Sequence, residues 1–192
     1  MIKFNKEYWE NRGKKKFYYR GEDFYTVTPI PYYYQRRKAL LELLDKELYS
    51  LGQKKKSISV LDFGCGDGFF SIYTKKLLPK SSIRGYDIAH SMIKRACVKR
   101  NSNYISDVHF STKFPSKEKF DVIYIFAVFA HLNDSQVHYL LHLLPRLLKN
   151  SGKIFLFEAT GNYPFRGSKW YRRTENEYLD IFMKNKLMIN YK

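Results

Sequence analysis

The sequence predicts an α/β fold, in which a mostly parallel sheet is covered by helices on both faces. Short apolar runs rich in β-branched residues alternate with segments whose apolar residues recur at helical spacing. A glycine-rich turn joins the first of these runs directly to the helical segment after it. Alternation of strands and helices is typical of parallel sheets, because each crossover helix returns the chain to the same edge of the sheet.

The glycine-rich turn is the most specific feature of the chain. Residues 57–63 have the pattern of a buried strand, and residues 69–78 have helical spacing. Between them lie Gly64, Gly66 and Gly68. Glycines allow a positive φ and let a ligand approach without meeting a Cβ, and the helix start that follows offers free N–H groups. The unit therefore predicts a nucleotide-binding turn.

A second strand supplies a partner for this turn. Residues 82–87 are expected to form a strand that ends in Asp87. An acid about twenty residues after such a turn accepts hydrogen bonds from ribose hydroxyls. The spacing Gly-x-Gly-x-Gly departs from the Gly-x-Gly-x-x-Gly of nicotinamide and flavin sites. Both elements indicate one nucleoside site without a dinucleotide fingerprint.

The other elements are expected on both sides of this unit. Upstream, a helix over residues 35–49 presents leucines at helical spacing to the sheet. Downstream, we expect a helix capped by Ser91 and ending near Arg100, strands at 103–107 and 120–126, a helix capped by Asn133 or Asp134 and kinked at Pro145, and a strand at 153–158.

These motifs resemble those of class I S-adenosylmethionine (SAM)-dependent methyltransferases. The resemblance begins with Asp62, the three glycines and Asp87, and covers roughly residues 35–158. Residues 103–107 resemble that family's third strand, and residues 120–126 with Ala130-His131-Leu132 resemble its fourth. The resemblance implies a Rossmann-like three-layer sandwich, SAM as cofactor and S-adenosylhomocysteine (SAH) as product.

The resemblance also implies roles for individual residues. The glycines would admit the methionyl and nucleoside portions, Asp62 would hold the amino end, Asp87 the ribose and Asp107 the adenine amino group. A basic residue upstream would pair with the methionine carboxylate, and Arg12, Arg36 and Arg37 remain alternatives. The full expected cofactor set is Tyr8, Arg12, Arg36, Asp62, Gly64, Cys65, Gly66, Gly68, Asp87, Ile88, Asp107, Val108 and Phe126.

His131 is the candidate catalytic residue, because it follows the fourth strand at the edge where open α/β sheets place ligands. It would act as a general base or orient the methyl acceptor, and the alternative is that it only packs or bonds to backbone. Glu158 faces the same region with the same alternatives. The sulfonium carbon is already activated, so the transfer to oxygen or nitrogen does not require a base.

The acceptor is predicted from composition and charge. The chain has 35 Lys and Arg against 18 Asp and Glu, a net charge of +17 spread along its length. We expect a small anionic or sugar-type metabolite as acceptor. The alternatives are RNA or protein methylation, with nucleic-acid binding favoured by the charge, and a non-catalytic SAM-binding subunit that needs a partner. Solvated lysines are a simpler explanation of the charge.

The composition also allows predictions of the cellular compartment and of metal binding. The sequence lacks an apolar run of membrane-spanning length and a signal-peptide core, which favours a cytoplasmic protein without membrane contact. Cys65 and Cys97 are expected to be free thiols. His138 and His142 lack a third ligand, so no metal is expected.

We expect residues 1–192 to form a single methyltransferase domain. Residues 1–34, rich in aromatic and basic side chains, would cap the cofactor site, and residues 35–160 would form the SAM-binding core. Residues 161–192 would supply an acceptor-side loop, a helix capped by Thr174 with Glu177, and a last strand at 186–191. The family's final antiparallel strand has no counterpart, and an unpaired edge would favour self-association.

Overall fold

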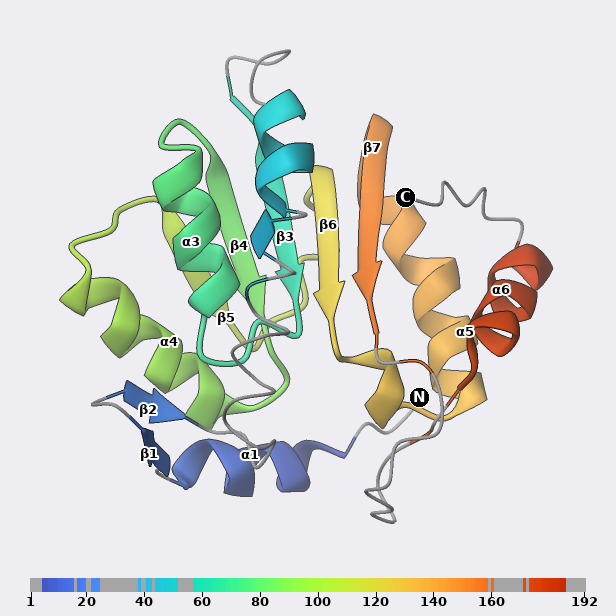
Figure 1. The fold of residues 1–192 in the computed structure, drawn as a ribbon, viewed down its shortest axis with the longest axis horizontal. Coiled ribbons are helices and arrows are strands. Elements are labelled where there is room, and N and C mark those ends of the chain that lie inside the picture. The colour runs from blue at the N-terminus through green and yellow to red at the C-terminus, as the bar shows by residue number, and fades with distance from the viewer. Residues whose placement is uncertain are drawn as a thin grey trace.

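The computed structural model describes residues 5–15, 17–19, 22–24, 38, 41–42, 44–51, 57–158, 160, 171 and 173–185. Its centre is a five-stranded sheet with the order β5-β4-β3-β6-β7, in which all neighbouring strands are parallel (Figure 1). The strands are β3 (Ser59–Phe63), β4 (Ser82–Tyr86), β5 (Val108–Ser111), β6 (Phe120–Phe126) and β7 (Leu148–Phe157). The predicted α/β class with a mostly parallel sheet is confirmed.

Helices cover both faces of this sheet (Figure 1). Helical residues 44–51, α3 (Phe69–Leu77) and α4 (His90–Ser102) lie on one face. On the other lie α5 (Asp134–Leu143), which a short 3-10 turn η2 (Leu144–Leu147) follows, and α6 (Glu175–Lys184). A further 3-10 turn, η1 (Phe129–His131), connects β6 to α5. The arrangement is the expected three-layer sandwich.

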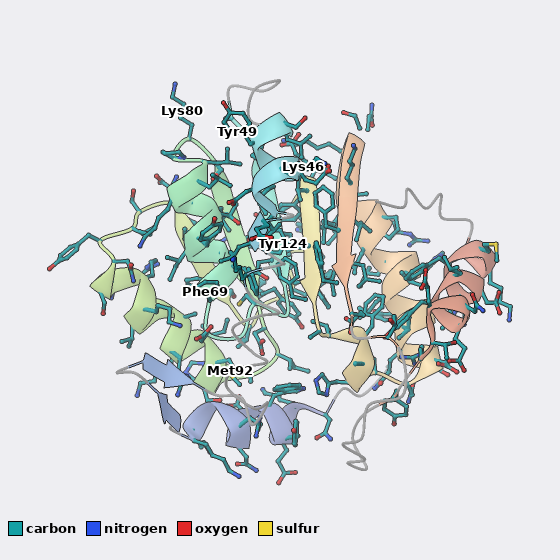
Figure 2. The ribbon with its side chains drawn as sticks, in the orientation of Figure 1. Lys46, Tyr49, Phe69, Lys80, Met92 and Tyr124 are labelled. Carbon is teal, nitrogen blue, oxygen red and sulfur yellow. The ribbon has the colours of Figure 1, made fainter. Side chains whose placement is uncertain are left out.

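The alternation of side chains along β6 shows how the two cores form. Ile123 and Ile125 point toward α5 and α6, whereas Val122 and Tyr124 point toward α3 and residues 44–51. All four are fully buried. Figure 2 labels Tyr124 on the α3 side, where its hydroxyl lies 3.1 Å from the Thr74 hydroxyl. A strand covered on both faces has the continuous apolar run seen in this sequence.

Three further elements lie before the core. Helix α1 (Lys6–Lys14) crosses below the carboxyl ends of the strands and packs on α4, and β1 (Phe17–Tyr19) pairs antiparallel with β2 (Glu22–Phe24) (Figure 1). All three elements belong to residues 1–34, the segment expected to cap the cofactor site. The β1–β2 hairpin was not predicted from the sequence.

Most predicted elements are confirmed, but three details are wrong. The third strand is Val108–Ser111 and not 103–107. Helix α4 begins after Ala89 and has no side-chain cap of its own, so Ser91 is not its cap. Pro145 does not kink a continuing helix, because α5 ends at Leu143 and Pro145 belongs to η2. The predicted strand at 186–191 and the start of the helix at residue 35 lie outside the described residues.

Among the described residues, no helix has the length and apolar character needed to cross a membrane. The same part of the chain contains no group of three metal-ligating side chains.

Candidate functional site

The glycine turn between β3 and α3 is left-handed at all three glycines. The φ angles of Gly64, Gly66 and Gly68 are 77°, 53° and 75°, values that residues other than glycine rarely adopt. The backbone N–H groups of Gly64 and Cys65 both donate to the Tyr86 carbonyl, at 2.8 and 2.9 Å. The turn is thus tied to the end of β4, next to the residue predicted to bind a ribose.

That residue, Asp87, holds the site together at the carboxyl end of β4. One carboxylate oxygen accepts from the Gly66 N–H at 3.0 Å, and the other accepts from the Ala89 N–H at 2.9 Å. A carboxylate has about four lone-pair positions, so acceptor capacity remains for a ligand. Burial raises the pKa of Asp87 to about 6, although these backbone hydrogen bonds act in the opposite direction.

Asp62 lies beneath the turn and is fully buried. Its carboxylate accepts from the Ser71 hydroxyl of α3 at 2.6 Å. Burial raises the pKa of Asp62 to about 7, and the neighbouring charges of Asp87 and Asp67 add to the increase. The Asp67 carboxylate is paired with Lys99 and accepts from the Phe69 N–H at the start of α3. Three carboxyl groups thus surround the glycine turn.

Helix α1 joins this region to the turn after β6. Glu10 accepts from the N–H groups of His90 and Ser91, at 2.6 and 3.0 Å, and so provides the cap that α4 lacks. Burial of its carboxyl group is the largest single effect and acts to raise the pKa of Glu10, but the hydrogen bonds from Ser91 and His90 together outweigh it and lower the pKa. One residue earlier, the Trp9 ring meets the His131 ring edge-on, with ring centroids 4.7 Å apart.

The turn that carries His131 is held from two sides. Glu158, which follows β7, accepts from the N–H groups of Val128, Phe129 and Ala130 at 2.8, 2.7 and 3.2 Å. Arg173 donates to the carbonyls of Phe129 and Leu132, at 3.0 and 2.7 Å. Glu158 therefore bonds to backbone, which was the alternative to a catalytic role.

Comparison with known proteins decides the family. The sequence profile of the family described as Methyltransferase domain matches residues 32–186, which include the glycine turn, Asp87 and His131. The chain belongs to the class I SAM-dependent methyltransferases. This finding confirms the resemblance drawn from the glycine turn, and with it SAM as the cofactor of the site.

Two kinds of curated relatives illustrate the range of acceptors. Malonyl-[acyl-carrier protein] O-methyltransferase from Bacillus cereus is 36% identical over 129 residues, which are 67% of this chain and 45% of that protein. Ubiquinone biosynthesis O-methyltransferase from Pelagibacter ubique is 27% identical over 158 residues, 80% of this chain and 60% of that protein. The chain thus spans about half the length of these relatives.

Solved methyltransferase structures share the fold at low sequence identity. The complex of DhpI with SAH has a TM-score of 0.70 and 15% identity, and covers 93% of this chain and 84% of its own. Magnesium protoporphyrin IX methyltransferase from Synechocystis with bound SAM has a TM-score of 0.61 and 19% identity, and covers 81% of this chain and 71% of its own.

The residues around the glycine turn fit SAM chemically. SAM carries a sulfonium and an ammonium group, and buried carboxyl groups with raised pKa values are stabilised in their charged form by a nearby cation. Asp62 and Asp87 are such groups. Asp87 would hold the ribose, as the sequence predicted, whereas the direct partner of Asp62 is Ser71. Asp62 thus supports the turn from below.

The predictions for Asp107 and Val108 are wrong. Val108 pairs with Ile83 at the amino ends of β5 and β4, so Asp107 lies at the opposite edge of the sheet from Asp87. The Asp107 side chain is 68% exposed and pairs with Lys75 at 3.4 Å, while Val108 is a buried core residue. Ser111 ends β5 beside Tyr86 and is the residue at the ligand edge.

The other predicted cofactor residues lie in the glycine turn, after β4, at the end of β6, on α1 or outside the described residues. Cys65 is buried in the turn, and burial raises the pKa of its thiol well above the ordinary value. Ile88 follows Asp87, and Phe126 ends β6 with its ring 4.2 Å from that of Phe70. Tyr8 and Arg12 lie one helical turn apart on α1. Arg36 and Arg37 are outside the described residues.

Sequence reasoning missed several residues that shape the site. Ser71, Glu10 and Arg173 each bond to a segment distant in sequence, from 9 to 81 residues away. Trp9 belongs to the aromatic segment expected to cap the cofactor site, but its ring contact with His131 was not predicted. The one local signal was the absence of a capping side chain at Ala89, which indicates that the start of α4 needs an outside acceptor.

Proposed function

We propose that this protein transfers a methyl group from SAM to an oxygen of an anionic acceptor, and that the acceptor is the free carboxylate of a malonyl thioester. The observation that carries the proposal is the 36% identity to a malonyl-[acyl-carrier protein] O-methyltransferase over 129 residues, 67% of this chain. The net charge of +17 supports an anionic acceptor, because a positive field raises the rate of encounter with anions.

The chemistry of a carboxylate acceptor suits the groups on the acceptor side. A carboxylate is already deprotonated near neutral pH, so its oxygen attacks the methyl carbon, the carbon–sulfur bond breaks, and the electron pair stays on the sulfur of SAH. The product is a methyl ester, and no proton is removed. Glu158 is engaged with backbone N–H groups, so His131 is the side chain assigned to the acceptor. Because no proton has to be removed, its role is to orient the acceptor, and positioning of this kind accelerates a displacement.

A phenolic acceptor is the second candidate, and His131 favours it. A phenol has an ordinary pKa near 10 and gains from a general base beside it. The similarity to ubiquinone biosynthesis O-methyltransferase covers 80% of this chain and points to the same chemistry. In this case His131 would accept the phenolic proton as the oxygen attacks.

We also propose that α1 covers the bound cofactor, as the N-terminal cap expected from the sequence. Support comes from its two contacts, Glu10 with the start of α4 beside Asp87, and Trp9 with His131. A helix that bridges the donor and acceptor sides excludes water from both.

The test is methyl transfer from radiolabelled SAM to three probes: malonyl-CoA, malonyl-[acyl carrier protein] and catechol. The proposal expects labelled methyl ester from at least one malonyl thioester and none from catechol. Transfer to catechol alone would replace the first candidate with the second. Transfer to none of the three, by a chain that binds SAH, would overturn both.

A further inference from the structure

The turn after β6 has a strained conformation at its first residue. Ala127 has a φ of 52°, in the left-handed region. An alanine there costs about 1–2 kcal/mol, and such strain persists only where the surroundings fix the backbone. The Ala127 N–H donates to the Phe157 carbonyl at 2.8 Å, which fixes this residue to the end of β7.

Glu158 continues this attachment by one residue. Its carboxylate accepts from three successive N–H groups, those of Val128, Phe129 and Ala130. These donors open a 3-10 turn of three residues, which cannot satisfy its own first N–H groups. Hydrogen bonds from N–H groups to a carboxylate are about twice as strong as neutral ones.

Arg173 holds the carbonyl side of the same turn. Its guanidinium donates to Phe129 and Leu132 and also forms an ion pair with Asp134 at 2.6 Å. The Arg173 side chain is 5% exposed, whereas that of Asp134 is 74% exposed. The buried guanidinium is thus satisfied by backbone carbonyls on one side and a surface carboxylate on the other.

We propose that Glu158 and Arg173 are positioning residues for methyl transfer, which act by fixing His131 against Trp9. The inference rests on the proposed function, in which His131 touches the acceptor. Both residues bond to the turn after β6, whereas the donor side is held by the hydrogen bonds of Asp87 to the Gly66 and Ala89 N–H groups. Loss of either should impair the acceptor side and spare SAH binding.

The variants that test this are Glu158→Gln and Arg173→Lys, with Glu118→Gln as the matched control. Gln keeps the size of Glu158 but offers one acceptor oxygen where the carboxylate offers two. Lys keeps the charge of Arg173 but lacks its planar fork of donors. Glu118 forms an ion pair with Arg84, at 3.0 Å, on a different part of the sheet.

We expect both variants to lower kcat/KM for the acceptor by about 10- to 100-fold, since a displacement of about 1 Å costs about 100-fold. SAH affinity and the control variant should stay within about two-fold of wild type. Combined with His131→Ala, Glu158→Gln should cause little additional loss, because residues that act through one another are not additive. Independent losses, or a parallel fall in SAH affinity, would overturn the inference.

A fluorescence measurement separates this inference from the proposed function, because it needs no acceptor. The chain has two tryptophans, so Trp170→Phe leaves Trp9 as the sole tryptophan, and excitation at the red edge of the absorption band selects it over the tyrosines. In that background Glu158→Gln should change Trp9 emission, as His131 moves away from the indole, while Glu118→Gln should not. Unchanged emission would overturn the positioning role even if transfer to malonyl thioesters is observed. If the wild-type chain transfers methyl groups to none of the probes, a changed Trp9 emission still supports the proposal that Glu158 fixes the position of His131.

Discussion

The Asp87 carboxylate accepts a hydrogen bond from the Gly66 N–H at 3.0 Å. This bond joins the end of β4 to the middle of the glycine turn, so the residue proposed to bind the ribose also fixes the loop around the rest of the cofactor. The Tyr86 carbonyl also accepts hydrogen bonds from the Gly64 and Cys65 N–H groups. These bonds join the ends of the neighbouring strands β3 and β4 in one site. Changes at Asp87 should therefore affect both a ligand contact and the shape of the turn.

Asp87→Ala should weaken SAH binding by about 10- to 150-fold, which corresponds to the loss of about 1.5–3 kcal/mol for a hydrogen bond to a charged group. Asp107→Ala is the matched control, because its carboxylate lies at the other edge of the sheet. Calorimetric titration of SAH checks both. Equal losses in the two variants would contradict the placement of the site.

Asp62 predicts a pH dependence of stability. Its pKa is raised by burial from 3.8 to about 7, so the folded chain holds this proton more tightly than the unfolded chain does. Near pH 3 the carboxyl group is protonated in both states, so its ionisation does not affect the free energy of unfolding. As pH rises from about 4 to about 7, ionisation in the unfolded state lowers the free energy of unfolding and destabilises the folded chain.

Asp62→Asn should remove this dependence, because the Asn oxygen still accepts from Ser71 and carries no charge. Urea denaturation from pH 4 to pH 8 should show wild type losing stability relative to the variant as pH rises. A constant difference across that range would mean that Asp62 does not titrate there.

Gly64→Ala should destabilise the chain by two separate effects. The left-handed φ of 77° costs an alanine about 1–2 kcal/mol, and the added Cβ would fall 2.4 Å from a methyl carbon of Val128. Adding Val128→Ala should recover the steric part alone, and thermal unfolding measures how much returns. Full recovery in the double variant would show that the φ angle carries no cost.

Gly13→Ala tests whether α1 covers the cofactor. A Cβ at Gly13 would lie 2.2 Å from the Ser91 hydroxyl oxygen and 3.0 Å from the Met92 nitrogen, so α1 must move away from α4, next to the buried Met92 that Figure 2 labels. We expect weaker SAH binding, although Gly13 precedes the glycine turn by some fifty residues in sequence. Asn11→Ala, on the exposed side of α1, is the control. Unchanged affinity in Gly13→Ala would exclude a covering role.

The contrast between Asp87 and Asp107 shows what the sequence could and could not predict. The strand before Asp87 follows an apolar pattern and a glycine turn that fix its register, so its position was predictable. Asp107 has a φ of 58°, and Tyr104 one of 52°. A strand cannot pass through left-handed residues, so β5 begins after Asp107, and pairing with β4 sets this register rather than local propensity.

The acceptor side was less predictable for a different reason. His131 was found because it follows a strand whose apolar run is unambiguous. Arg173 and Glu10 act on backbone groups 44 and 80 residues away, and backbone carbonyls and N–H groups leave no trace in the side-chain pattern. Contacts of this kind appear only when the fold brings the segments together.

Titration calorimetry of SAH into the wild-type chain tests the central claim most directly, with NADH as the control ligand. We predict saturable binding of SAH at one site per chain and no binding of NADH, because the turn has the Gly-x-Gly-x-Gly spacing and Asp87 beside it. Absence of SAH binding by a folded chain, or binding of NADH in its place, would contradict the assignment of this site to a methyl donor.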